Sequence, residues 1–185
     1  SLAAFPLVFF IVFLGNIHNL DVSMFRWVMK RKHLLLWARL CRDLSRTADG
    51  FAYPLLGLLL WYGAGTPGQL FALTMAMAFA LERPLYALLK KGLKRHRPAD
   101  ALPNYQSFII PSDQFSFPSG HTSGAFAMAT GLAMYFPETT IIAYSWACLV
   151  AVSRVTLGVH FPTDTLAGAL MGTLLTLFAG FWITQ

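Results

Sequence analysis

Three short clusters in the second half of the chain have residue types and spacings suited to phosphate chemistry. In chain order they are Lys90 with Arg97-Pro98, Pro118-Ser119-Gly120-His121, and Ser153-Arg154 followed by His160 and Asp164. Hydrolysis of a phosphate ester needs a nucleophile, a proton for the departing oxygen and positive charge beside the phosphoryl oxygens. The clusters contain a candidate for each of these roles.

The first cluster supplies two cations at helical spacing. Lys90 and Arg97 are seven positions apart, which is about two turns at 3.6 residues per turn. If the helix continues, both side chains project from one face toward one phosphate, and Pro98 ends the helix. The neighbouring cations Lys91, Lys94 and Arg95 are predicted to face lipid, with their charged ends at the membrane surface.

The second cluster stands where an apolar segment begins, which predicts a helix N-terminus. Free backbone N–H groups there form an anion site, and Gly120 allows a phosphate to approach closely. Ser119 would add a hydroxyl donor, or would simply cap the helix. His121 alone would suit a structural, hydrogen-bonded histidine, and at an anion-binding helix end it is also placed to protonate a departing oxygen.

The third cluster pairs a deep cation with a histidine and a carboxylate. Arg154 follows an apolar helix, where a cation is costly without an anionic partner such as phosphate. Asp164 comes four residues after His160, close enough to accept a hydrogen bond from the imidazole and leave the other ring nitrogen free to attack phosphorus. The alternative role for Asp164 is to favour a helix N-terminus, worth about 0.3 to 1 kcal/mol.

Together the clusters resemble the three signature motifs of the type 2 phosphatidic acid phosphatase superfamily, with every motif position present in the right order over residues 90–164. The resemblance implies that His160 forms a phosphohistidine intermediate, that Asp164 orients it, and that His121 is the general acid. It implies the following phosphate-binding residues: Lys90, Arg97, Ser119, Gly120 and Arg154. It also implies a reaction without metal or other cofactor, and the sequence has no carboxylate cluster suited to Mg²⁺.

The composition is that of an integral membrane protein. The 185 residues have a mean hydropathy of +0.56, and only 12% are charged, so we expect a single transmembrane domain over residues 1–185. The net charge of +6 lies beside membrane-length segments and the motifs. It therefore favours anionic lipid headgroups over nucleic acid as partner. Cys41 and Cys148 are isolated, which argues against a disulfide framework or a thiolate metal site.

The apolar segments predict an all-α bundle of six transmembrane helices. They are residues 2–17, 51–65, 68–89, 119–136, 139–152 and 162–184, with residues 2–17 interpreted as a retained helix, not a signal peptide. Residues 19–49 mix aromatic and aliphatic with basic residues, which predicts an amphipathic helix in the membrane interface, a solvated loop with a short helix being the alternative. Residues 63–68 predict a tight turn. With this count, all three motifs lie on one membrane face.

Several other residues carry weaker signals. Gly168 and Gly172 are spaced for close helix approach, either within the bundle, which we favour, or at a dimer face, so the oligomeric state is left open. Glu82 and Arg83 are predicted to pair with structural neighbours, the alternative being a place in the site. The loop 99–117 is the expected place for headgroup selectivity or a lid.

The function expected from these features is that of a bacterial inner-membrane lipid phosphatase. Its candidate substrates are phosphatidic acid, phosphatidylglycerol phosphate, undecaprenyl diphosphate and lipid A phosphate. The alternatives are a lipid phosphotransferase using the same histidine and a non-enzymatic lipid-phosphate binder or transporter. Haloperoxidase chemistry, found among proteins with similar motifs, is disfavoured by the membrane character. The positive-inside rule would place the basic motif face in the cytoplasm, whereas the resemblance implies a periplasmic or extracytoplasmic site, which we prefer.

Overall fold

A computed structural model describes residues 5–32, 34–111 and 113–185, with side chains described from residue 17 onward. Within these ranges every regular element is helical, which confirms the all-α class. The elements are α1 (Phe5–Met29), α2 (Leu34–Arg46), α3 (Ala52–Gly63), α4 (Gly65–Leu93), α5 (Pro98–Ala101), α6 (Gly120–Tyr135), the 3-10 turn η1 (Pro137–Thr139), α7 (Thr140–Thr156) and α8 (Pro162–Ile183). Residues 2–4 of the first predicted span and residue 112 of the predicted loop lie outside the described residues.

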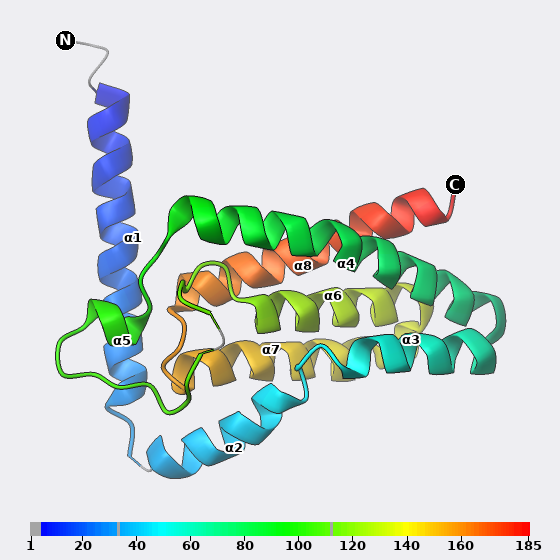
Figure 1. The fold of residues 1–185 in the computed structure, drawn as a ribbon, viewed down its shortest axis with the longest axis horizontal. Helices are drawn as coiled ribbons and strands as arrows, with labels where there is room; N and C mark the ends of the chain where they lie inside the picture. The colour runs from blue at the N-terminus through cyan, green and yellow to red at the C-terminus, as the bar shows by residue number, and fades with distance from the viewer. Residues whose placement is uncertain (1–4, 33, 112) are drawn as a thin grey trace.

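The helices α3, α4, α6, α7 and α8 run side by side as a bundle (Figure 1). The helix α6 packs against α4, α7 and α8, and its buried face consists largely of small residues. Small residues let helix backbones approach closely, which is how helices pack where no water is present to drive burial. The helix that carries the second motif is thus held from several sides.

Three stretches of the described chain are long and apolar enough to cross a bilayer: Gly65–Ala101, Pro137–Thr156 and Pro162–Ile183. The helix α3 is apolar but shorter. Large apolar side chains also point outward from the bundle, as expected for contact with lipid; they include Leu58, Leu59, Leu73, Ile141, Leu149, Leu170 and Leu174. The membrane character is therefore supported, while the predicted number of six spans is not confirmed.

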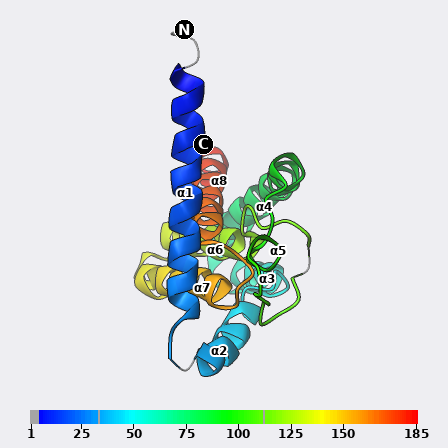
Figure 2. The ribbon, with the colours of Figure 1, turned by 90° about the vertical axis from the view of Figure 1, so that its left-hand side faces the viewer.

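The helix α1 does not run alongside the others. Figures 1 and 2 show it crossing the end of the bundle at a steep angle. The predicted amphipathic segment 19–49 is accordingly divided: residues 19–29 continue α1, a turn follows at residues 30–32, and only α2 is a separate amphipathic helix. No glycine or proline interrupts residues 16–29, so the first helix extends past its apolar part.

Gly168 and Gly172 face α6 inside the bundle. A Cβ added at Gly168 would lie 2.4 Å from the carbonyl oxygen of Ser119, and one at Gly172 would lie 2.1 Å from that of Ser123. This close approach confirms the expected packing role within the bundle. The predicted turn near residues 63–68 is confirmed as well, because α3 ends at Gly63 and α4 begins at Gly65, which has a φ of +60°.

The motifs meet at the end of the bundle that α1 crosses. The backbone N–H of Ser119, before α6, donates to the carbonyl oxygen of Asp164 in α8 at 3.0 Å. The C-terminal ends of α4 and α7 lie at the same end (Figure 1). The prediction that the three motifs meet in space is therefore confirmed.

Candidate active site

Lys90 and Arg97 converge on one carboxylate, that of Asp113 in the long loop after α5. The Nζ of Lys90 lies 2.5 Å from Asp113 Oδ1, and Arg97 donates to the same oxygen. The helix does not continue from Lys90 to Arg97, because α4 ends at Leu93 and Lys94 takes a left-handed conformation with a φ of 47°. Pro98 begins α5 and does not end α4. The two cations meet through a turn of the chain.

Asp113 is strongly held as an anion. Burial alone would raise the pKa of its carboxyl, but hydrogen bonds from Lys90, Tyr86 and Arg97 lower the pKa to about 2. The Tyr86 hydroxyl donates to Asp113 Oδ2 at 2.6 Å. Three donors thus surround a carboxylate at the place where the sequence predicted a phosphate.

Ser119 and Gly120 begin α6 as predicted. Ser119 is the N-cap of the helix, is fully buried, and its Oγ accepts from the N–H of Thr122. A Cβ on Gly120 would lie 2.9 Å from the ring of Tyr86. The glycine therefore lets Tyr86 lie against the helix N-terminus, whose free N–H groups attract anions.

His121 is partnered by Asp49, a residue between α2 and α3. His121 Nε2 lies 2.9 Å from Asp49 Oδ1. A carboxylate only accepts, so this contact places a proton on Nε2. Asp49 was not identified from the sequence, where nothing marked it among the other polar residues before α3.

Arg154 lies in the last turn of α7 and is 5% exposed. Its Nη1 donates to Ser45 Oγ of α2 at 2.7 Å, whereas its Nε has no hydrogen-bond partner among the described residues. A buried guanidinium with unused donors is costly unless an anion completes it. This agrees with the predicted need of Arg154 for an anionic partner.

His160 is 2% exposed, and its Nδ1 lies 3.8 Å from Oδ2 of Asp164. That separation is too long for the hydrogen bond that the four-residue spacing predicted, and the two groups form an ion pair only when the imidazole is protonated. Burial lowers the pKa of His160 to about 4, and Arg154 and Arg97 add to this effect while Asp164 opposes it. The imidazole is therefore neutral near pH 7, which leaves a ring nitrogen able to act as a nucleophile.

Asp164 has a second partner that the sequence analysis assigned to lipid. Arg95 was expected to face headgroups with Lys91 and Lys94, and this was wrong for Arg95 alone. Its Nη1 donates to Asp164 Oδ1 at 2.6 Å, and its Nη2 donates to Asp21 Oδ2 at 2.6 Å. Lys91 and Lys94 are exposed as predicted. No spacing rule distinguished Arg95 from its neighbours, because Asp21 is distant in sequence.

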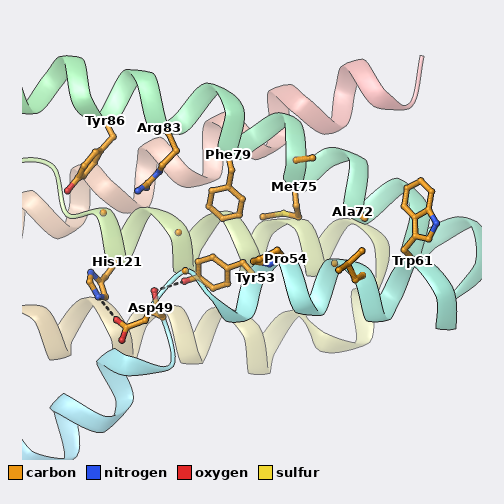
Figure 3. A pocket seen from close by; sticks show the side chains of 17 residues that line it. Asp49, Tyr53, Pro54, Trp61, Ala72, Met75, Phe79, Arg83, Tyr86 and His121 are labelled. Carbon is orange, nitrogen blue, oxygen red and sulfur yellow. Dashed lines mark hydrogen bonds and ion pairs between the residues drawn. The ribbon is translucent and has the colours of Figure 1, made fainter. Parts of the chain in front are cut away.

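Two cavities meet at His121. The first, of about 700 Å³, is an apolar groove between α3 and α4 lined by residues such as Trp61, Met75 and Phe79. Figure 3 shows His121 and Asp49 at one end of this groove and Trp61 toward the other. The second cavity, of about 550 Å³, is polar and is lined by Arg42, Ser45, Arg46 and Arg154. His121 and Asp49 line both cavities.

Arg83 is the cation on the wall of the apolar groove. It pairs with the buried carboxylate of Glu82, as the sequence analysis favoured. Its guanidinium also lies over the ring of Tyr86, 4.9 Å from the centroid. Figure 3 shows both side chains across the groove from His121. Arg83 therefore pairs with its structural neighbour Glu82 while it lines the groove.

The chain matches the family model of the PAP2 superfamily over residues 69–184. It is 32% identical over 128 residues to the bacitracin transport permease protein BcrC of Bacillus licheniformis, covering 69% of this chain and 63% of BcrC. It is 37% identical over 114 residues to phosphatidylglycerophosphatase B of Bacillus subtilis, covering 56% of this chain and 53% of the relative. In both cases the match spans less than two thirds of the relative's length.

The fold of this chain is also similar to that of a solved structure. The crystal structure of Aquifex aeolicus LpxE superposes with a TM-score of 0.74 and 29% sequence identity, over 86% of this chain and 94% of LpxE. The helical arrangement that brings the motifs together is therefore shared with that protein.

Proposed function

Because this chain belongs to the PAP2 superfamily, we propose that it is a metal-independent membrane phosphatase that hydrolyses a lipid phosphate or diphosphate through a phosphohistidine. The observation that carries the proposal is the position of His121 between an apolar groove and a polar cavity. A lipid phosphate has an apolar tail and an anionic head, and the bond to be broken joins the two. His121 stands where that bond would lie.

The apolar groove is the proposed site for the lipid tail. Its volume of about 700 Å³ falls within the range of roughly 300 to 1,000 Å³ that is common for ligand pockets. Residues of α3 and α4 such as Pro54, Leu58 and Ala76 line it. A tail in this groove places the ester oxygen at the end where His121 and Asp49 lie (Figure 3).

The phosphoryl group is proposed to bind among Lys90, Arg97, Arg154 and the N-terminus of α6, where Ser119 and Gly120 lie. Lys90 and Arg97 already hold an anion there, the carboxylate of Asp113. Arg154 has a buried Nε without a partner among the described residues. The phosphate takes the place of the Asp113 carboxylate and adds Arg154 as a ligand. Guanidinium groups suit this role because their donors match phosphate oxygens in pairs.

The proposed reaction has two steps. In the first, a ring nitrogen of His160 attacks phosphorus, the bond between phosphorus and the lipid oxygen breaks, and His121 gives that oxygen a proton. In the second, water attacks the phosphohistidine, His121 takes back a proton, and phosphate leaves with His160 restored. The lowered pKa of His160, about 4, keeps the nucleophile unprotonated. Asp164 stabilises the positive charge that the imidazole gains.

The proposed substrates are phosphatidic acid, phosphatidylglycerol phosphate and undecaprenyl diphosphate. One relative's name, phosphatidylglycerophosphatase B, supports the second of these. We further propose that the protein lies in a bacterial inner membrane with its site on the extracytoplasmic face.

The proposal is tested by phosphate release in detergent micelles with EDTA present, using these three lipids as a panel. We expect release by the wild-type protein and none by His160→Ala. His96→Ala is the matched control because His96 is exposed, and it should keep its activity. Release by purified His160→Ala at a rate near wild type would overturn the proposed mechanism.

The name of BcrC, a bacitracin transport permease protein, favours a second candidate, a lipid-phosphate binder or transporter. A binder would retain lipid phosphate without releasing inorganic phosphate, and His160→Ala would leave its binding function intact. A phosphotransferase, the other alternative, would release little phosphate until a lipid acceptor is added. The same panel with and without acceptor lipid distinguishes the three.

A further inference from the structure

An ionic cluster of two buried carboxylates and the partly exposed Arg95 joins the first helix of the chain to the third motif. Arg95 lies between two carboxylates, with its Nη1 2.6 Å from Asp164 Oδ1 and its Nη2 2.6 Å from Asp21 Oδ2. Asp21 belongs to α1 and is 1% exposed. We propose that Asp21 and Arg95 are positioning residues that hold the Asp164 carboxylate toward His160. This inference rests on the proposed function.

The contacts of Asp164 fix the orientation of its carboxylate. Oδ1 accepts from Arg95, and Oδ2 accepts from the backbone N–H of Phe161 at 2.8 Å. With a donor on each oxygen, the carboxylate cannot turn about its Cβ–Cγ bond without losing a hydrogen bond. Oδ2 is the oxygen that lies 3.8 Å from Nδ1 of His160. Arg95 therefore determines which oxygen faces the imidazole.

Arg95 is itself held on several sides. Besides the two carboxylates, its Nη1 donates to the hydroxyl of Thr163 at 2.8 Å, and its guanidinium lies 4.6 Å from the centre of the Phe161 ring. Asp21 Oδ1 accepts from the backbone N–H of Thr163 at 2.9 Å, in the first turn of α8. The cluster thus fastens α1 to the start of the helix that carries Asp164.

Packing around the cluster shields its two carboxylates from water, while the Arg95 side chain is 22% exposed. The Phe25 ring of α1 lies edge-on to Phe161, with centroids 5.7 Å apart, and edge-on to Tyr105 at 5.0 Å. Phe25 and Phe161 are both buried. Ionic hydrogen bonds are stronger where water is excluded, and an unmatched charge there is correspondingly costly.

The charges of the cluster explain why Asp21 is needed. Arg95 alone would neutralise Asp164, and the pair would offer no net charge to His160. With Asp21 the three groups carry a net charge of −1, so Asp164 can still stabilise an imidazole that becomes positive when phosphoryl is attached. Outer partners of this kind orient a functional histidine and commonly affect activity by roughly 10- to 100-fold.

This cluster lies partly outside the region that defines the family. The family model begins at residue 69, so it does not include Asp21. Arg95 is within the first motif but between its two signature cations, Lys90 and Arg97. The proposed positioning of Asp164 therefore depends on a residue of α1 that lies outside the matched region.

The test compares Asp21→Asn and Arg95→Lys with wild type. In the first variant the amide oxygen can still accept from Thr163, and in the second the ammonium keeps the charge but cannot bridge two carboxylates with a planar fork. We expect kcat for lipid phosphate hydrolysis to fall roughly 10- to 100-fold in each variant. KM and the inhibition constant of inorganic phosphate should stay within about two-fold, because neither residue is placed on the phosphate. Lys91→Gln, which changes an exposed neighbouring cation, is the control and should match wild type.

The outcomes separate this inference from the proposed function. If wild type releases no phosphate from any lipid, the proposed function fails. If wild type is active and both folded variants keep its kcat, the inference fails alone. A rise in KM and in the phosphate inhibition constant with unchanged kcat would also overturn it, because the cluster would then serve phosphate binding. Gel filtration and thermal unfolding establish that each variant is folded, and Arg95→Lys carries the test if Asp21→Asn does not fold.

Discussion

Gly168→Ala should damage stability and activity together, because Gly168 lies where α8 touches the beginning of α6. The added Cβ would lie 2.4 Å from the carbonyl oxygen of Ser119, whereas ordinary contacts begin near 3.4 Å. The neighbouring atom is backbone and cannot rotate away. The two helices must therefore separate locally by about 1 Å, which at the usual cost of overpacking is about 1 to 3 kcal/mol.

The same displacement reaches the site. The hydrogen bond from the N–H of Ser119 to the carbonyl oxygen of Asp164, 3.0 Å long, joins the second motif to the third. A shift of about 1 Å between catalytic groups can reduce the rate roughly 100-fold. We expect Gly168→Ala to lower kcat on this scale and to lower the melting temperature in detergent.

Gly92→Ala is the matched control. Gly92 lies in α4, and nothing is within 4 Å of the position that its Cβ would take. Alanine is favoured over glycine in a helix by up to about 1 kcal/mol, so this variant should be neutral or slightly stabilised and fully active. A Gly168→Ala protein with the kcat and melting temperature of wild type would refute the close packing of α6 on α8.

Three further predictions concern the charged groups of the site. The pKa of His160 is about 4, below its ordinary 6.5, so the folded protein binds fewer protons than the unfolded chain between these values. The free energy of unfolding should therefore decrease as pH falls from 6.5 to 4, which denaturation across that range would measure. Over the same range kcat/KM should fall with a midpoint near pH 4. A midpoint near 6.5 would contradict the burial of His160. Arg154→Lys should lower kcat/KM roughly 100-fold through loss of its paired donors. The matched control Arg39→Lys changes an exposed arginine of α2 that lines neither cavity and should keep the wild-type kcat/KM; equal activity of the two variants would exclude phosphate binding by Arg154. Asp113→Asn should strengthen inhibition by inorganic phosphate, because the phosphate then competes with no carboxylate for Lys90 and Arg97. The lowered pKa of Asp113, about 2, measures how strongly those donors hold the carboxylate. About half of that free energy, for a half-buried group that solvent screens, corresponds to inhibition that is roughly three- to ten-fold stronger. Weaker inhibition would mean that Asp113 orients Lys90 and Arg97 and does not compete with phosphate.

Most helices were predictable because apolar length is a local property. The predicted segment 162–184 is α8 (Pro162–Ile183), and 119–136 is α6 (Gly120–Tyr135). The helix α1 was the exception, since its apolar beginning and polar continuation form one helix. Its crossing of the bundle end depends on contacts with residues far along the chain, such as that of Asp21 with Arg95.

The long loop shows a second limit. Residues 99–117 were identified as a place for selectivity, but no local pattern indicated that Asp113 would reach Lys90 and Arg97. Asp49 beside His121 is a similar case. An acidic residue in a loop is usually solvated. Asp113 and Asp49 differ from that pattern only through their partners, which are Lys90 and Arg97 for Asp113 and His121 for Asp49.

Because motif spacing and apolar length depend on neighbours along the chain, the sequence by itself determined the family and the helical class of this protein and predicted its candidate site residues. Only the tertiary structure decided which groups partner them. Asp113 lies on Lys90 and Arg97, Asp49 on His121, and Arg95 with Asp21 on Asp164. These pairings join residues up to 74 positions apart, and burial of Asp21 and Asp164 strengthens the contacts of Arg95. Neither the pairings nor the burial exists until the helices pack.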